Sequence, residues 1–165
     1  MGSFEKKALV RSLNRAEKPV LLGLVENKHS NLTHRDVWNL WGGNNVGWVH
    51  CLAIDKSGGL ILMSVMRDVD AIIKVFSISK AEIWLCLHCC LVYDNFESLI
   101  CLIYAPTDIL QRRECWDQLR ALKNQVSIPL LMVGNFNEVL AAHERKIPAS
   151  SSTGMHHFEL LVQDL

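Results

Sequence analysis

The sequence lacks a net charge. Lys+Arg and Asp+Glu each number 17 among 165 residues, so the formal net charge is zero. The chain therefore has no overall excess of the cations that neutralise nucleic-acid phosphates. This balance disfavours tight non-specific DNA binding and leaves room only for a local basic patch. Hydrophobic residues make up 50% and charged residues 21%, which excludes a disordered chain and favours one domain with a sizeable core.

The sequence also lacks targeting and membrane segments. Residues 1–18 are charged and contain no apolar run of the signal-peptide kind. Gly2 is not followed by the Ser or Thr that an N-myristoylation signal needs at its sixth position. The longest apolar run, Ile83 to Tyr93, is interrupted by His88 and is too short to span a membrane. We expect an intracellular protein, nuclear or cytoplasmic, that is not secreted and binds no membrane.

A complete metal-binding cysteine motif is absent. Cys86 and Cys89 have CxxC spacing with His88 between them, but no second CxxC or HxxxH follows to complete four ligands. These residues lie in an apolar run typical of a strand, where neighbouring side chains face opposite sides. We interpret the six cysteines as buried core residues. We expect reduced thiols, because the sequence has no secretion signal.

Hydrophobic periodicity predicts an α+β chain without internal repeats. An amphipathic helix is expected before Pro19, and a loop is expected around Trp38 and Trp41. Short connections favour antiparallel strands, with helices outside the sheets. The further predicted helices cover Asp108–Asn124 and Met155–Leu165. The predicted strands cover Val20–Val25, Gly47–Ile54, Leu60–Met66, Val69–Ile78, Ile83–Tyr93, Ser98–Tyr104 and Ile128–Val133, with a turn over Asp55–Gly59 and a loop at Ser150–Ser152.

Three segments, in order, carry a family resemblance. They are LGLVENK at Leu22–Lys28, IYAP at Ile103–Pro106 followed by a helix with RRECW, and LLMVGNFNEVL at Leu130–Leu140. Together they resemble the endonuclease/exonuclease/phosphatase domain of plant LINE-type (non-LTR) retrotransposons. The resemblance covers nearly the whole chain. It implies a four-layer α/β sandwich, two β-sheets flanked by helices, of which residues 1–165 form a single, truncated domain with the C-terminal half missing.

The resemblance also implies a chemistry and its residues. Members of the family cleave phosphodiester or phosphomonoester bonds with Mg²⁺, an ion that prefers oxygen ligands. Glu26 matches the metal ligand, and Tyr104 matches the tyrosine near the scissile phosphate. Asn137 matches the asparagine that orients the phosphate and the attacking water. Asn135 stands where the family has the aspartate that activates this water. DNA is the implied partner, and the oligomeric state is left open.

Each of these residues also has a purely structural interpretation. A glutamate at a strand end is commonly a solvated charge, and Tyr104 fits a half-buried strand aromatic. Asn135 and Asn137 fit turn formers after Gly134. The five tryptophans, Trp38 and Trp48 among them, fit core positions better than base-stacking positions.

The departures from the family pattern predict impaired catalysis. An amide at Asn135 cannot accept a proton, and by analogy with an Asp-to-Asn change in a serine-protease triad the loss is on the order of 10⁴-fold. The family's opening strand with its own Asn, and the later Asp and Asp–His pair, have no counterpart. Loss of half the sandwich would expose apolar sheet faces and favour aggregation.

We therefore interpret the chain as a retrotransposon-derived, Mg²⁺-dependent phosphodiesterase (endonuclease) domain fragment, reverse transcriptase-associated in origin and catalytically impaired. The alternative is a non-catalytic nucleic-acid or protein interaction module that retains part of the fold. An active phosphoesterase completed by a partner chain is the third interpretation, and Asn135 argues against it.

Overall fold

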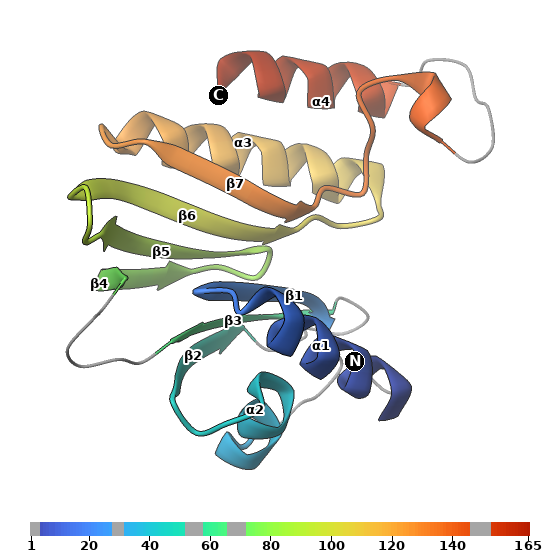
Figure 1. Ribbon diagram of the computed structural model, residues 1–165. Coiled ribbons are helices and arrows are strands. Elements are labelled where there is room, and N and C mark those ends of the chain that lie inside the picture. The colour runs from blue at the N-terminus through green and yellow to red at the C-terminus, as the bar shows by residue number, and fades with distance from the viewer. Residues whose placement is uncertain (1–3, 28–31, 52–57, 66–71, 146–152) are drawn as a thin grey trace.

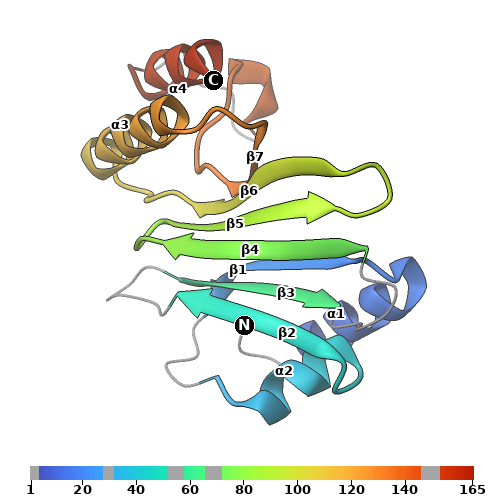
Figure 2. The same ribbon diagram turned by 90° about the vertical axis from the view of Figure 1, so that its left-hand side faces the viewer.

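Two β-sheets pack face to face between two layers of helices (Figures 1 and 2). The computed structural model describes residues 4–27, 32–51, 58–65, 72–145 and 153–165. This arrangement confirms the predicted α+β class with two sheets flanked by helices. The helices are α1 (Phe4–Glu17), α2 (His34–Trp41), α3 (Ile109–Gln125) and α4 (Thr153–Asp164), with a short 3-10 helix η1 (Ala142–Glu144). The strands are β1 (Leu21–Asn27), β2 (Val46–Cys51), β3 (Gly59–Val65), β4 (Ile73–Lys80), β5 (Trp84–Leu91), β6 (Phe96–Tyr104) and β7 (Leu130–Asn135).

Strand order divides the chain at the passage from β3 to β4. The three-stranded sheet has the order β1-β3-β2 and is antiparallel throughout. The four-stranded sheet has the order β4-β5-β6-β7, and its last pair, β6 with β7, is parallel. The expected antiparallel meander is therefore confirmed for β4, β5 and β6, and the parallel pairing of β7 was not predicted. Helix α3 connects β6 to β7, and a parallel pair needs a crossover of this kind.

The main core lies between the two sheets. Alternate residues of β5 illustrate the pattern, since Leu85, Leu87 and Cys89 face the three-stranded sheet while Cys86 faces outward under α3. Residues of both sheets share this core, and each fully buried leucine contributes about 1.5–3 kcal/mol of transfer free energy. The buried members are Cys51, Leu60, Leu62, Ile73, Leu85, Leu87, Cys89 and Leu102.

Two outer cores attach the helices. Under α3 and α4, Trp116 is 1% exposed and packs against the tilted rings of Phe136 and Phe158 at ring-centroid distances of 6.1 and 5.3 Å. Under α1 and α2, Trp48 packs half-buried beside Val37 and Met63. The core interpretation of the tryptophans is therefore confirmed for Trp116, and for Trp41, Trp48 and Trp84 as partly buried residues. It is wrong for Trp38, whose side chain is 44% exposed.

Helix α2 stands where the sequence pattern predicted a loop. Thr33 begins it with a capping box, accepting a hydrogen bond from the Asp36 backbone amide while the Asp36 carboxylate accepts one from the Thr33 amide. Gly42 ends it in the left-handed conformation, with φ at 92°. Both caps are readable in the sequence. The helix is only two turns long, which makes its apolar periodicity short and easy to miss.

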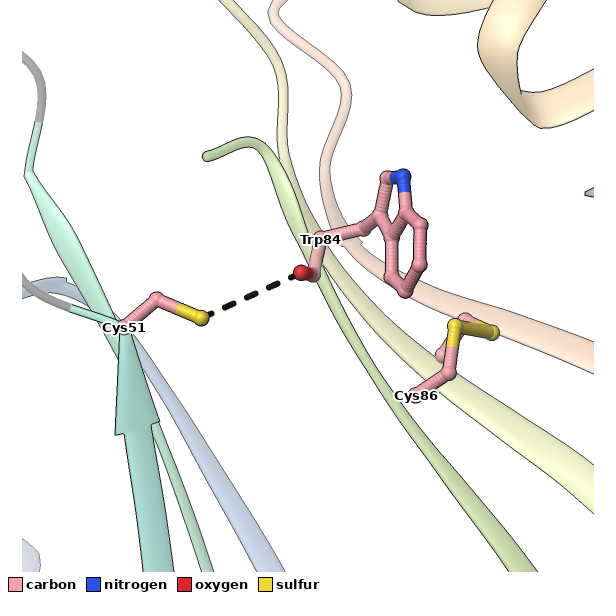
Figure 3. The surroundings of a disulfide bond; sticks show 4 residues. Cys51, Trp84 and Cys86 are labelled. Carbon is pink, nitrogen blue, oxygen red and sulfur yellow. Dashed lines mark hydrogen bonds between the residues drawn. A yellow bond between two sulfur atoms is a disulfide. The ribbon is translucent and has the colours of Figure 1, made fainter. Parts of the chain in front are cut away.

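The cysteines are buried as expected, but two of them are not free thiols. Cys86 and Cys101 face each other in the antiparallel β5–β6 register and form a disulfide. The expectation of reduced thiols is therefore wrong for this pair, because strand register and not spacing along the chain brought them together. Figure 3 shows the surroundings: the Cys51 thiol points from β2 toward the Trp84 carbonyl of β5, at 4.0 Å, while the Trp84 ring lies on the other side of β5. Cys51, Cys89, Cys90 and Cys115 are free and buried.

Strand β7 is an edge strand and not the buried strand that its apolar sequence suggested. It pairs with β6 on one side, and Leu131 and Val133 remain 52% and 40% exposed. None of the helices in the described ranges has the length and apolar character needed to cross a bilayer. Most of the expected turn at Asp55–Gly59, the start of the strand predicted at Val69, and the loop at Ser150–Ser152 lie outside the described residues.

Gly134 generates a test of this fold. Its φ is 139°, and a Cβ built on it would lie 2.0 Å from the Ile103 carbonyl oxygen, so the β6–β7 pair admits only glycine there. We expect Gly134→Ala to lower the free energy of unfolding by at least about 2 kcal/mol, measured by urea denaturation. Gly43→Ala is the matched control, because a Cβ at Gly43 meets nothing within 4 Å. Equal effects of the two substitutions would contradict the close strand approach.

Candidate active site

Glu26 projects from a distortion at the end of β1. The pairing of β1 with β3 shifts register between Leu24 and Asn27, and Glu26 in this bulge has a φ of 59°. Positive φ is uncommon for a non-glycine residue, and bulges re-aim side chains at sheet ends. Gly58 lies against this backbone, since a Cβ on it would be 2.3 Å from the Glu26 Cα. The bulge and this glycine together fix the position of the Glu26 carboxylate.

Tyr104 ends β6 and joins the predicted residues. Its hydroxyl lies beside the side chains of Glu26 and Asn137, close enough for both to act on its pKa. Burial of the hydroxyl, followed by the negative charge of Glu26 and the hydrogen bond to it, raises the pKa of Tyr104 above its ordinary value, while the bond with Asn137 offsets part of this rise. Tyr104 is therefore protonated at neutral pH and is available as a hydrogen-bond donor.

Asn135 and Asn137 occupy the turn that follows β7. Asn135 pairs in register with Tyr104, and its carbonyl accepts from the Ala105 amide at 2.9 Å. Its side-chain Oδ1 accepts from the Asn137 backbone amide at 2.8 Å. Asn137 adopts a φ of 49°, and its Nδ2 donates to the Ala105 carbonyl at 2.5 Å. The turn-former interpretation is therefore correct for both residues, and for Asn137 it coexists with the contact to Tyr104.

The four predicted residues thus lie at one edge of the sandwich. The structure brings Glu26, Tyr104 and Asn137 into side-chain contact, whereas the Asn135 side chain is engaged in its own turn. The edge presents one carboxylate, one phenol and one free amide oxygen. Such a set offers a hydrogen-bond donor to a phosphate oxygen and acceptor oxygens to a metal ion or a water.

A dedicated metal cage is not formed by these residues. Within the described ranges, no group of three or more His, Cys, Asp or Glu side chains is arranged to hold an ion. Glu26 is a ligand of the type that Mg²⁺ takes. Mg²⁺ is commonly held by one or two carboxylates with waters and substrate phosphates. The donor set therefore fits at most a site with one protein carboxylate, completed by water and phosphate oxygens.

A buried ionic cluster fixes the two loops that carry the site. Glu138, which directly follows Asn137, has a side chain only 2% exposed. It accepts from Arg112 at 3.0 Å and from Arg145 at 2.5 Å. Arg112, itself 9% exposed, also donates to the Pro106 and Thr107 carbonyls in the loop after Tyr104. The pair therefore holds the loop after β6 against the loop after β7.

Helix α4 closes over this cluster. A Cβ on Gly154 would lie 2.3 Å from Glu138 Oε2, so only a residue without a side chain fits there. Arg112 and Glu138 lie within the family-like segments RRECW and LLMVGNFNEVL, but the sequence predicted no role for either residue. Their partnership could not be derived from spacing, because 26 residues separate them.

Comparisons with known proteins agree with this fold. No protein-family model matches the chain, and no curated protein matches its sequence. Among solved structures, the AP endonuclease LMAP from Leishmania major superposes with a TM-score of 0.65 at 14% identity, over 97% of this chain and 61% of that one. The catalytic domain of human Nocturnin superposes with a TM-score of 0.55 at 16% identity, over 81% of this chain and 56% of that one. An endonuclease/exonuclease/phosphatase family protein from Bacteroides thetaiotaomicron gives 0.59 at 11%, over 81% and 55%.

These similarities define the class of fold. The chain has the endonuclease/exonuclease/phosphatase fold, and its structural neighbours include an AP endonuclease and an endonuclease/exonuclease/phosphatase family protein. It spans about 55–61% of the length of these three structures. At such identities the likeness establishes the fold alone.

The buried cluster generates a test. We expect Glu138→Gln to lower the free energy of unfolding by about 3 kcal/mol or more, because two guanidinium groups lose their buried counter-charge. Arg120→Gln is the control: it removes ion pairs to Asp117 and Asp164 whose side chains are 69% and 57% exposed, and should cost less than about 1 kcal/mol. Chemical denaturation measures both. Similar small losses would show that Glu138 is not a desolvated counter-ion.

Proposed function

We propose that this chain is a retrotransposon-derived, Mg²⁺-dependent phosphodiesterase (endonuclease) domain fragment whose catalysis is impaired, and that the Glu26 edge engages DNA phosphates. One observation carries the proposal: Glu26 and Asn137, residues that are 111 positions apart, both lie beside the Tyr104 hydroxyl, at one edge of a sandwich with the endonuclease/exonuclease/phosphatase fold. The similarity to an AP endonuclease supports the same class of substrate.

Each residue would have a distinct role in binding. Glu26 would hold the Mg²⁺, which when bound polarises a phosphoryl oxygen and offsets its negative charge. Tyr104, protonated at neutral pH, would donate a hydrogen bond to a phosphate oxygen in place of its contact with Glu26, whose carboxylate would turn to the metal ion. The Asn137 side-chain oxygen would accept from a water beside the phosphate, because its Nδ2 is already committed to Ala105.

Impaired catalysis follows from Asn135. A general base must accept the proton of the attacking water, and an amide has no basic site for it. The Asn135 oxygen is moreover occupied by the Asn137 backbone amide. With one carboxylate at the edge, both proton transfer and metal retention are weak.

The second candidate is a non-catalytic interaction module that keeps the fold without the chemistry. The hydrogen bond from Asn137 to Asn135 favours it, because the side chain at the water-activating position has a structural role. DNA binding without cleavage would distinguish this module from an enzyme.

The proposed retrotransposon origin rests on the segments LGLVENK, IYAP and LLMVGNFNEVL. The intracellular, nuclear or cytoplasmic location is a separate proposal that these segments do not carry. Genomic sequence on either side of the coding region tests the origin. A neighbouring reverse transcriptase reading frame would support it, and an unrelated intact gene would contradict it.

Cleavage of supercoiled DNA tests the activity. We expect no Mg²⁺-dependent nicking by the natural sequence, and none after Asn135→Asp alone, because the metal would still have one protein carboxylate. Glu26→Ala tests whether any activity belongs to this site, with the exposed Glu159→Ala as the control. Nicking by the natural sequence that Glu26→Ala abolishes would contradict impairment. Nicking restored by Asn135→Asp alone would mean that one substitution separates this chain from a working enzyme.

A further inference from the structure

Four aromatic rings form a continuous row on the outer side of the three-stranded sheet. They belong to His50 and Trp48 of β2 and to His34 and Trp38 of α2. Successive ring centroids lie 5.1, 5.7 and 6.0 Å apart. β2 is an edge strand of its sheet, and Trp48 and His50 are alternate residues that share its outer face. The Trp48 indole nitrogen lies 3.5 Å from His34 Nδ1, which aligns the two elements.

Cations stand at both ends of the row. At the Trp38 end, Arg11 and Arg15 line an open hollow of about 360 Å³ together with Asn39, Gly42 and Asn44. At the His50 end, Lys80 donates to the His50 carbonyl at 3.3 Å. The hollow beside Trp38 is therefore locally basic, although the net charge of the whole chain is zero.

The two guanidinium groups that line the hollow make few hydrogen bonds or ion pairs within the described part of the chain. Arg11 donates its Nε to the Asn39 carbonyl at 2.6 Å, leaving the two terminal nitrogens of its guanidinium. Within the described residues, Arg15 has no hydrogen-bond or ion-pair partner. No carboxylate lines the hollow. Asp36, the acidic residue of α2, is occupied by the α2 cap at Thr33 and lies 3.9 Å from Lys7 of α1.

We infer that this aromatic–basic row is a binding surface for single-stranded nucleic acid. Phosphates would occupy the hollow between Arg11 and Arg15, and a base would stack on the exposed indole of Trp38. Proteins that bind single strands combine a cationic groove with aromatic side chains in this manner. Duplex DNA hides its base faces and would gain only the phosphate contacts. The row lies on the outer face of the three-stranded sheet. Strand β1 of this sheet carries Glu26 of the candidate active site, but the inference does not depend on catalysis there.

The alternative is that the arginines and aromatic rings of the row have only a structural role, which is to stabilise α2. It accounts for Arg11, whose Nε satisfies a carbonyl in the last turn of the helix. It does not account for Arg15 or for the indole of Trp38, which is 44% exposed. Arg15 and Trp38 are therefore the informative positions, because their side chains can be removed without opening the core.

Fluorescence anisotropy with a labelled oligothymidylate, and with a duplex of equal length, tests the inference. We expect Trp38→Ala and Arg15→Gln each to weaken single-strand binding by about fivefold or more at unchanged melting temperature. We expect Arg15→Gln also to reduce the dependence of binding on salt. The controls are Tyr93→Ala, an aromatic residue 80% exposed at the β5–β6 turn, and Arg113→Gln, on the exposed side of α3; neither should change binding.

The outcomes separate this surface from the proposed nuclease site. Binding that survives Glu26→Ala but falls with Trp38→Ala supports the row, whatever the result of the cleavage assay. The inference is overturned if the natural sequence binds no single strand, if the control variants are equally damaging, or if the duplex binds as tightly and only Glu26→Ala weakens it. Insensitivity to both Trp38→Ala and Arg15→Gln would assign the row to α2 stability alone.

Discussion

The ion pair between Arg112 and Glu138 is the contact on which the geometry of the candidate site depends. It joins the loop after β6 to the loop after β7, and these loops carry Ala105 and Asn137. Removing both charges from water has a high free-energy cost, which the further bonds to Arg145 and to backbone carbonyls offset, although Arg112 Nε is left without a hydrogen-bond partner. The main effect of such a cluster is to hold the two loops in one defined arrangement. Its net contribution to the free energy of unfolding is small by comparison.

The strand topology converts that local arrangement into a site. Because β6 and β7 are parallel, Tyr104 and Asn135 end at the same edge, and the bulge in β1 directs Glu26 toward it. The placement of these residues is nevertheless distinct from their capacity for catalysis. The edge brings the predicted residues together, yet the side chain at position 135 is an amide that accepts a hydrogen bond within its own turn. The aromatic row on β2 and α2 lies on the outer face of the three-stranded sheet and does not involve Asn135.

Most helices and strands that depend on local sequence patterns were predicted correctly. Contacts that depend on strand register and on packing between distant segments were missed. Apolar runs separated by a turn predicted β5 and β6, and the helical spacing of apolar residues after Asp108 predicted α3. The ordered motifs predicted that Glu26, Tyr104 and Asn137 would cluster. The Cys86–Cys101 disulfide and the Arg112–Glu138 pair depend on strand register and loop packing, which no spacing reveals. The edge position of β7 also escaped prediction, because an apolar hexapeptide reads the same whether one or two neighbours flank it.

Titration of Tyr104 tests most directly whether the predicted residues meet. The chain has two tyrosines, so Tyr93→Phe leaves Tyr104 as the only source of the tyrosinate absorbance that rises with pH. The carboxylate of Glu26 disfavours the negative tyrosinate and helps to raise the pKa of Tyr104 after the effect of burial. In the Tyr93→Phe background, Glu26→Gln should therefore shift the titration midpoint to lower pH, whereas the distant Glu159→Gln should leave it unchanged. A midpoint that does not move on Glu26→Gln would show that the two side chains are not neighbours, and the candidate active site would be wrong.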